Sequence, residues 1–396
     1  IFPIDDIPKK DPYGENPVRA FRWDGTTVFK SGWNEDDFVF VMRTGPFVNH
    51  QHYDQGSFWL ADKGVLFMKE RTGVGYYNNP YYQSSYIQPV GHSTILIDHN
   101  PQSQRIGDRR DFAPGFDDYA YIRMFLDSQN AAYSSGDIGR LYWGAVKSLR
   151  RNVLYLKPRT LLMLDTAIPA EKDVDVTLLY QVDLLKNITP GKELSSISNE
   201  GNTLSIHHLH PADRIIEAVE TPQYSRATAG GTPPDKPGML TVTARTGGSS
   251  LVLANILSTN PAGDVTITST GAGFVAGTAS GAPFAFSTAP GKQYSVREIS
   301  TDALALTWTR ESVLAAEMRY LSRNGKLLVR SPEPMVCEVS PKGIRYCLEK
   351  ESAVILGLEK EPPAIRVNGI KASFRYDSSA RSARLALPAG EGIIEF

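Results

Sequence analysis

Two histidines and an acid stand at alternate positions in the first part of the chain. They are His50, His52 and Asp54, in the segment VNHQHYDQGSFWL at residues 48–60. If this segment is a β-strand, the alternation of its side chains places all three on one face. Imidazole and carboxylate groups side by side are suited to zinc binding or to proton transfer. Alone, however, the pattern is more typical of a solvated strand face, so the rest of the chain must decide.

Two later segments carry residues of the same types. GVLFMKERTGVGYY, at residues 64–77, predicts an apolar strand that runs into Glu70 and a turn. GHSTILID, at residues 91–98, places His92 at the start of another apolar strand. A histidine, a carboxylate and a second histidine on neighbouring strands supply three zinc ligands and leave a fourth position for water. Half-buried histidines held by hydrogen bonds are the competing interpretation.

Composition limits the function classes. The chain has 396 residues, with 42 basic and 43 acidic side chains and a net charge of −1. This balance gives no reason to expect a nucleic-acid partner. No segment approaches the roughly 20 consecutive apolar residues of a membrane span. The chain begins IFPIDDIPKK, without Met and without a signal-like apolar core, which indicates a processed product with a further part upstream.

The predicted fold class is all-β. Short runs rich in β-branched and aromatic residues are separated by Gly, Pro, Asn and Asp, as in antiparallel sheets. Only WTRESVLAAEMRYL, at residues 308–321, predicts a helix of any length. We therefore expect a large antiparallel β-sandwich over residues 1–312 and a smaller C-terminal antiparallel β domain over residues 313–396. The runs include FVFVM, SFWLA, STILID, VLYLK, TLLMLD, VDVTLLYQV, MLTVTA and SLVLANIL.

The two cysteines flank a predicted hairpin, VCEVSPKGIRYC. With the turn centred on Pro341 and Lys342, Cys337 faces Tyr346, and the thiols of Cys337 and Cys347 lie on opposite faces. A loop one residue longer or shorter would place the thiols opposite each other and allow a disulfide. Two packed, reduced thiols are the expected state.

Two other clusters carry side chains that bind ligands elsewhere. In HHLH, His208 and His210 share a strand face, but no nearby acid completes a metal set and Pro211 ends the strand, so we expect a surface edge. In SLRRNVLYL, Arg150 and Arg151 precede an apolar run. At least one of these arginines is expected to be structural, because an arginine inside an apolar strand needs a charged partner.

In combination and order, four segments resemble the heparinase II/III family of polysaccharide lyases. They are FRWDGTTVFKSGW, NHQHYDQGSFWLADKGVLFMKERTGVGY, GHSTILID and SLRRNVLYLKPRTLLMLDTA, which together cover roughly residues 20–170. The resemblance implies β-elimination on a uronic-acid polysaccharide by a secreted or periplasmic enzyme. A base removes the weakly acidic proton beside the sugar carboxylate, an acid protonates the departing glycosidic oxygen, and an unsaturated sugar remains.

The same resemblance implies roles for the histidines. His50 belongs to the catalytic cleft and binds or neutralises the uronate. His52, His92 and the acid at the end of the GVLFMKE strand hold a structural zinc. That acid is usually Asp in the family and is Glu70 here, so Asp54 remains a competing third ligand.

The candidates for substrate binding are Asn49, Arg105 and Arg109. Guanidinium groups bind carboxylate or sulfate through paired hydrogen bonds. Asp108 and Asp111 stand beside the two arginines in QSQRIGDRRDF, so a self-neutralised loop is the competing interpretation for that segment.

The family's cleft lies between a helical toroid and the β-sandwich. This chain shows no series of long amphipathic helices, so the toroid domain is expected from an upstream segment or a second chain. Some relatives place a functional Tyr on the sandwich side, and Tyr82 and Tyr86 in YYNNPYYQSSY are the preferred catalytic pair. A tyrosine, with an ordinary pKa near ~10, acts as a base only where positive charge lowers its pKa. Packing, or stacking on sugar rings, is the competing role.

Three functions are compatible with the sequence. The first is the β portion of a lyase that cleaves an acidic polysaccharide. The second is a non-catalytic polysaccharide-binding β-sandwich with a structural zinc. The third is a structural β-protein of a cell envelope that has no sugar site.

Overall fold

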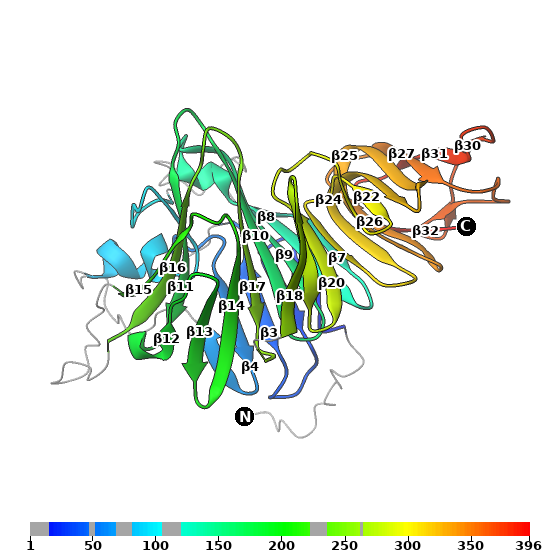
Figure 1. Ribbon diagram of the computed structural model, residues 1–396. Coiled ribbons are helices and arrows are strands. Elements are labelled where there is room, and N and C mark those ends of the chain that lie inside the picture. Colours follow the sequence, from blue (N-terminus) through cyan, green and yellow to red (C-terminus); the bar gives the residue numbers. More distant parts are fainter. Residues whose placement is uncertain (1–15, 47–51, 69–80, 105–119, 222–235, 262–263) are drawn as a thin grey trace, which may run out of the picture.

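The computed structural model describes residues 16–46, 52–68, 81–104, 120–221, 236–261 and 264–396. These residues form four antiparallel sheets joined by turns and short helical segments (Figure 1). The all-β prediction is confirmed. The helical segments are Tyr82–Tyr86, Pro89–Gly91, Gly139–Tyr142 and Leu185–Asn187. No helix in the described part of the chain is both long and apolar enough to cross a membrane.

Three sheets are built from the first two thirds of the chain. A five-stranded sheet has the order β1 (Arg19–Phe21), β2 (Thr26–Lys30), β3 (Val39–Arg43), β4 (Phe58–Asp62) and β5 (Val65–Met68). An eight-stranded sheet has the order β12 (Ile188–Thr189), β13 (Leu194–Asn199), β14 (Asn202–His210), β17 (Leu251–Ser258), β10 (Thr160–Pro169), β9 (Val146–Leu156), β8 (Ala131–Asp137) and β7 (Tyr121–Asp127). A four-stranded sheet has the order β15 (Ile215–Glu220), β16 (Gly238–Arg245), β11 (Asp175–Val182) and β6 (Ile95–Ile97).

The last third of the chain forms a fifteen-stranded sheet. Its first strands are β18 (Val265–Gly271), β19 (Phe274–Ala279), β20 (Ala282–Ser287), β21 (Tyr294–Val296), β22 (Ile299–Thr301), β23 (Ala305–Trp308) and β24 (Val313–Arg323). Its later strands are β25 (Lys326–Ser340), β26 (Gly343–Leu348), β27 (Ser352–Gly357), β28 (Arg366–Val367), β29 (Ile370–Lys371), β30 (Phe374–Asp377), β31 (Ser382–Leu387) and β32 (Gly390–Glu395). Strands from both sides of residue 312 pair in this sheet; the division into two domains there stays a prediction.

The eight-stranded sheet is covered on both faces. Leu161 and Met163 of β10 pack into one core with the five-stranded and four-stranded sheets. Their neighbours Leu162 and Leu164 pack into another core with the start of the fifteen-stranded sheet. This burial explains why TLLMLD is a continuous apolar run, since a strand with one face in water would alternate apolar and polar residues.

The helix predicted at residues 308–321 is wrong. A long strand, β24, occupies most of that range, and it pairs with β23 and β25. The pairing register of β24 shifts around Glu317, whose φ is +57°. Such a bulge adds one residue to a two-residue repeat. Across the bulge, two buried residues on the same face of the strand are therefore three positions apart, as Ala315 and Met318 are. This is the spacing of residues on one face of a helix.

The hairpin of the two cysteines is as predicted. Cys337 lies directly opposite Tyr346 in the pairing of β25 with β26. Cys337 packs into the core of the fifteen-stranded sheet, and Cys347 packs into the core shared with the eight-stranded sheet. Both are free thiols, and burial raises the pKa of each above its ordinary value.

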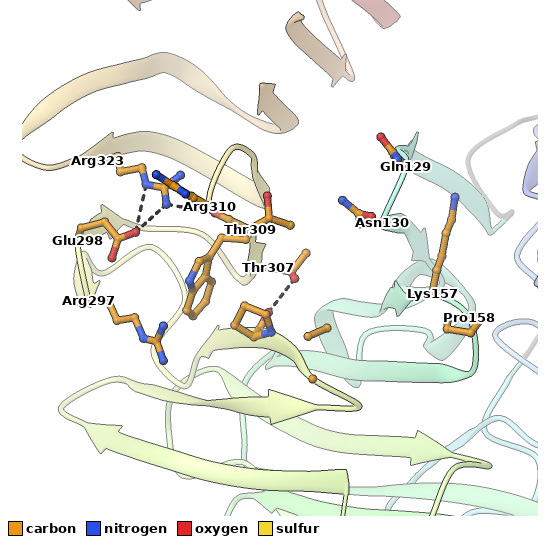
Figure 2. Close-up of a pocket in the computed structure, with 14 residues that line it drawn as sticks. Gln129, Asn130, Lys157, Pro158, Arg297, Glu298, Thr307, Thr309, Arg310 and Arg323 are labelled. Atoms are coloured by element: carbon orange, nitrogen blue, oxygen red, sulfur yellow. Dashed lines mark hydrogen bonds and ion pairs between the residues drawn. The ribbon is translucent and has the colours of Figure 1, made fainter. Parts of the chain in front are cut away.

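A cavity of about 690 Å³ opens where the eight-stranded and fifteen-stranded sheets meet. Figure 2 shows Gln129, Asn130 and Lys157 facing Arg297 and other residues of the C-terminal strands across this space. Its lining combines residues of turns with residues of β20, β23 and β24, so polar and apolar side chains share its walls.

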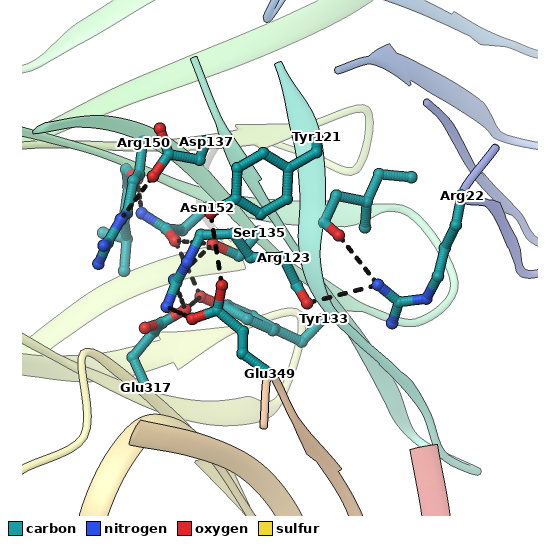
Figure 3. A network of polar contacts seen from close by, with 12 residues as sticks. Arg22, Tyr121, Arg123, Tyr133, Ser135, Asp137, Arg150, Asn152, Glu317 and Glu349 are labelled. Carbon is teal, nitrogen blue, oxygen red and sulfur yellow. Dashed lines mark hydrogen bonds and ion pairs between the residues drawn. The ribbon is translucent and has the colours of Figure 1, made fainter. Parts of the chain in front are cut away.

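A buried polar network connects the same two sheets (Figure 3). Arg123 of β7 forms an ion pair with Glu317 of β24, with 2.7 Å between Nη1 and Oε1, and a second one with Glu349. Tyr133 donates a hydrogen bond to Asn152 over 2.9 Å. Burial lowers the pKa of Arg123, but Glu317 and Glu349 more than offset this effect and raise it. The charges of this network are therefore compensated inside the interface.

The surface edge predicted for His208 is wrong. Strand β14 lies between β13 and β17, and the His208 side chain is buried. Its Nε2 lies 2.9 Å from Ser195 Oγ, and its Nδ1 lies 2.7 Å from Asn255 Oδ1. Burial is the main cause that lowers the pKa of His208, to about 4. The register of β14 against β17 shifts between His208 and His210, so the strict alternation that would place both on one face is interrupted there.

Acid should therefore destabilise the protein through His208. The unfolded chain has an ordinary histidine pKa near ~6.5, so it binds more protons than the folded chain between about pH 6.5 and about pH 4. Stability should be fully present above this window and fall by roughly 3 kcal/mol as pH decreases through it. Denaturant unfolding across this pH range measures the loss. His208→Gln should show a smaller loss, and exposed His99→Gln the same loss as the unsubstituted protein; a full loss in His208→Gln contradicts the assignment.

Candidate active site

Two of the three predicted zinc ligands lie side by side. His52 is in the loop between β3 and β4, and His92 follows the helical turn Pro89–Gly91 before β6. Their ring centroids are 5.1 Å apart, with the planes inclined by 51°. The His92 side chain is buried, whereas His52 is partly exposed. The strand predicted for residues 50–54 does not extend over His52, Tyr53 and Asp54, which lie in an irregular loop.

The separation of the two imidazoles fits a shared zinc ion. Two imidazoles bound to one tetrahedral zinc have their ring centroids about 5 Å apart, given Zn–N bonds of about 2.0–2.1 Å. The spacing of His52 and His92 therefore suits two ligands of one ion. A zinc bound there would supply a rigid link between the two loops, while the proton transfers of a reaction would fall to side chains nearby.

Asp54 does not complete this set. Its Oδ2 lies 3.7 Å from Arg43 Nε, and its Oδ1 accepts a hydrogen bond from Gln55. No group of three His, Cys, Asp or Glu side chains suited to a metal is found within the described ranges. Glu70 lies outside those ranges. Glu70 therefore stays the proposed third ligand.

The two preferred tyrosines lie next to the histidine pair. Tyr82 and Tyr86 form the ends of the π-helical turn Tyr82–Tyr86, a local form often found at functional sites. The edge-to-face contact of Tyr86 with His52 has a centroid distance of 4.8 Å, and Tyr82 lies 5.8 Å from Tyr86. Tyr53 N donates a hydrogen bond of 2.7 Å to Ile87 O, which holds the turn against the histidine loop. Four aromatic rings thus form one continuous cluster.

The remaining predicted site residues fall outside the described part of the chain. They are His50, Asn49, Glu70, Arg105 and Arg109. Their positions relative to the histidine and tyrosine cluster stay predictions.

Arg151 holds the two histidine loops in place. Its guanidinium donates to Asp165 Oδ1 over 2.8 Å and to Asp165 Oδ2 over 3.3 Å, and the whole pair is buried. The same guanidinium donates through Nη1 to the carbonyls of Gly56 and Ser93. Burial raises the pKa of the Asp165 carboxyl, and Arg151 opposes that shift. The prediction that at least one arginine of the pair is structural is therefore confirmed.

A second set of hydrogen bonds joins the same loops. Gln104 Nε2 donates to Gln55 O over 2.7 Å and to Tyr142 Oη over 3.0 Å. Gln55 N donates to Gln104 Oε1, and Thr94 Oγ1 donates to Gln55 O. Sequence reasoning missed these residues, because polar side chains in loops show no spacing that distinguishes a supporting residue from a solvated one.

The fold is that of the β domains of polysaccharide lyases. The heparan sulfate lyase HepC from Pedobacter heparinus superposes with a TM-score of 0.52 and 19% identity, over 63% of this chain and 38% of that one. A heparinase III superposes with a TM-score of 0.51 and 11% identity, over 82% of this chain and 42% of that one. The chain thus spans about two fifths of the length of these solved structures.

The sequence agrees with this assignment. The family model for the heparinase II/III-like C-terminal domain matches residues 16–236, which is more than half of the chain. The chain therefore belongs to the heparinase II/III-like family. No match is found among curated proteins.

Proposed function

We propose that the chain is the β portion of a lyase that cleaves a uronic-acid polysaccharide by β-elimination. The observation that carries this proposal is the contact of His52 with both His92 and Tyr86 in a chain of this family. The proposal includes a helical toroid domain, from an upstream segment or a second chain, that closes the other side of the cleft. A location outside the cytoplasm is part of the same proposal.

The chemistry determines what the cluster must do. The proton beside the sugar carboxylate is weakly acidic, so the carboxylate must be neutralised before a base can remove that proton. In the proposal, His50 neutralises the carboxylate, with Asn49, Arg105 and Arg109 binding the acidic chain. The deprotonated side chain of Tyr82 or Tyr86, a phenolate, removes the proton and becomes a phenol. A phenol of this pair then gives a proton to the departing glycosidic oxygen as the C–O bond breaks.

In this mechanism the residues around the cluster provide rigidity. Arg151 and Gln104 connect the segment that follows His52 to the segment that follows His92. Rigid support matters because misplacing a catalytic group by about 1 Å lowers the rate on the order of a hundredfold. Zinc on His52, His92 and Glu70 would add a second link between the loops.

The test is formation of unsaturated product, followed by ultraviolet absorbance. The chain is mixed with heparan sulfate, chondroitin sulfate or alginate, alone and together with the helical part of its full-length protein. We expect product only with the helical part present. Tyr86→Phe should lower that rate by at least about a hundredfold if Tyr86 is the base, and Tyr82→Phe should do so if Tyr82 is.

The matched control is Tyr81→Phe, because Tyr81 is an exposed tyrosine beside the same turn. It should retain the full rate. If the completed protein forms no unsaturated product from any of these polymers but still binds one of them, the chain is a binding module instead.

A further inference from the structure

The cavity between the sheets is distinct from the candidate active site. Lys157 and Pro158, in the turn between β9 and β10, line the cavity. The buried pair of Arg151 with Asp165, which holds the histidine loops, lies farther along the same two strands, away from that turn. Asp165, the partner of Arg151, is seven residues beyond Pro158, which corresponds to roughly 20 Å along a strand. A ligand in this cavity would therefore lie far from the histidine and tyrosine cluster.

The cavity continues into a second one. A neighbouring cavity of about 300 Å³ shares Gln129, Asn130 and Thr309 with the first. We call the two together the interlayer groove. Its length and its amide side chains suit an extended polar ligand more than a single small ion, because a small ion would contact only a few of these groups.

The lining of the interlayer groove is basic, although the whole chain has a net charge of −1. Three acidic side chains, Glu298, Glu311 and Glu338, stand against six basic ones. The basic residues are Lys157, Arg297, Arg310, Arg323, Lys342 and Arg345. A groove with a local excess of positive charge concentrates anions.

Two of these guanidinium groups are available to a ligand. Arg323 is bound by Glu298, with 2.7 Å between Nη2 and Oε1. Arg297 and Arg310, by contrast, are exposed and have no hydrogen bond or ion pair within the described part of the chain, although the charge of Arg297 helps to lower the pKa of Glu298. Figure 2 shows Arg297 and Arg310 on the side of the cavity that lies across from Gln129 and Asn130, with Arg310 drawn beside Arg323. Both arginines come from turns between C-terminal strands. Guanidinium groups bind carboxylate and sulfate through two parallel hydrogen bonds.

We propose that the interlayer groove binds an anionic oligosaccharide as a second, non-catalytic site. Arg297 and Arg310 bind its carboxylate or sulfate groups, and Gln129 and Asn130 bind its hydroxyl groups. The anion site follows from the groove itself, whereas the choice of a uronate-containing sugar rests on the proposed function. Such a site holds a second stretch of the polymer while another stretch occupies the cleft.

Direct titration tests the groove without relying on elimination. The probes are a heparan sulfate hexasaccharide, an oligogalacturonate of equal length and an uncharged malto-oligosaccharide, each titrated into the 396-residue chain. The double substitution Arg297→Ser with Arg310→Ser should weaken binding of an anionic probe by about tenfold or more, and should reduce the salt dependence of that binding.

The matched control replaces Arg375 and Arg384 by Ser. These residues face each other on β30 and β31, are exposed, and lie outside the interlayer groove. The control removes the same charge and should leave affinity unchanged. Unchanged melting temperatures of both variants exclude unfolding as the cause.

Several results would overturn the groove proposal. One is that the groove double variant binds the anionic probes as tightly as the control double variant does. Two others are that the uncharged probe binds as tightly as the anionic ones, or that neither anionic probe binds. The last is that a single-stranded DNA of equal charge binds more tightly than the oligosaccharides through the same arginines. If the chain together with its helical part forms no unsaturated product but still binds the anionic probes through the same arginines, the proposed lyase function is wrong. The groove proposal is then still supported.

Discussion

Replacement of Arg151 by Met should lower the free energy of unfolding by about 3–5 kcal/mol, because it leaves the buried carboxylate of Asp165 without its partner. It also removes the donors to the Gly56 and Ser93 carbonyls, so the loops of His52 and His92 lose their common support. Denaturant unfolding measures the first effect. The loss of loop support is measured, under the proposed function, by the rate of elimination in the chain together with its helical part.

The neighbouring Arg150 offers the matched control. Arg150 lies one position along β9, is about one third exposed, and forms an ion pair with Asp137 over 3.4 Å. Arg150→Met should cost below about 1 kcal/mol, because water compensates an exposed charge. Equal destabilisation by the two substitutions would show that the Arg151–Asp165 pair is not the source of the effect.

Removal of His52 or His92 should remove zinc from the protein. Each is proposed to supply one of three protein ligands, and loss of a ligand also removes folding energy linked to the metal. After dialysis against a mild chelator, we expect one zinc per chain in the unsubstituted protein and none in His52→Ala or His92→Ala. Both variants should melt at a lower temperature.

Two further histidines separate metal binding from catalysis. His50→Ala should retain zinc and thermal stability but abolish elimination in the completed enzyme. His99→Ala should retain all three, because His99 is exposed and its Nε2 lies 3.7 Å from Asp175. Stoichiometric zinc in His52→Ala would show that the ligand assignment is wrong, and full activity of His50→Ala would make His50 a structural residue.

Much of the fold was predictable because local signals agreed with it. Apolar runs bounded by Gly, Pro and Asn gave strands such as β4, β10 and β17, and the pairing of Cys337 with Tyr346 followed from hairpin alternation. The helix prediction failed because the bulge near Glu317 imitates helical spacing. The interior position of His208 was missed because the sequence of a strand does not show which strands pair with it. Strand β14 has a partner on each side, so it is not an edge strand.

The candidate site was predictable only in part. The family resemblance predicted His52 and His92 as neighbours, and the structure places their rings side by side. The roles of both histidines and of Tyr86, whose ring contacts His52, stay predictions. The binding of Arg151 to the Gly56 and Ser93 carbonyls was not predictable, since backbone acceptors in loops have no side-chain signature. The interlayer groove is formed by turns and strands that are distant in sequence, so only the tertiary structure brings its arginines together.

The burial of the eight-stranded sheet on both faces has an evolutionary consequence. A substitution within its middle strands, such as β10, alters a packed core on one side or the other. New binding properties are therefore acquired most easily in the turns at the strand ends, where insertions and charge changes leave both cores intact. The histidine loops lie at such strand ends, and turns there contribute Gln129, Lys157, Arg297 and Arg310 to the interlayer groove. Proteins with this layered framework can thus change what they bind through their loops while both cores stay the same.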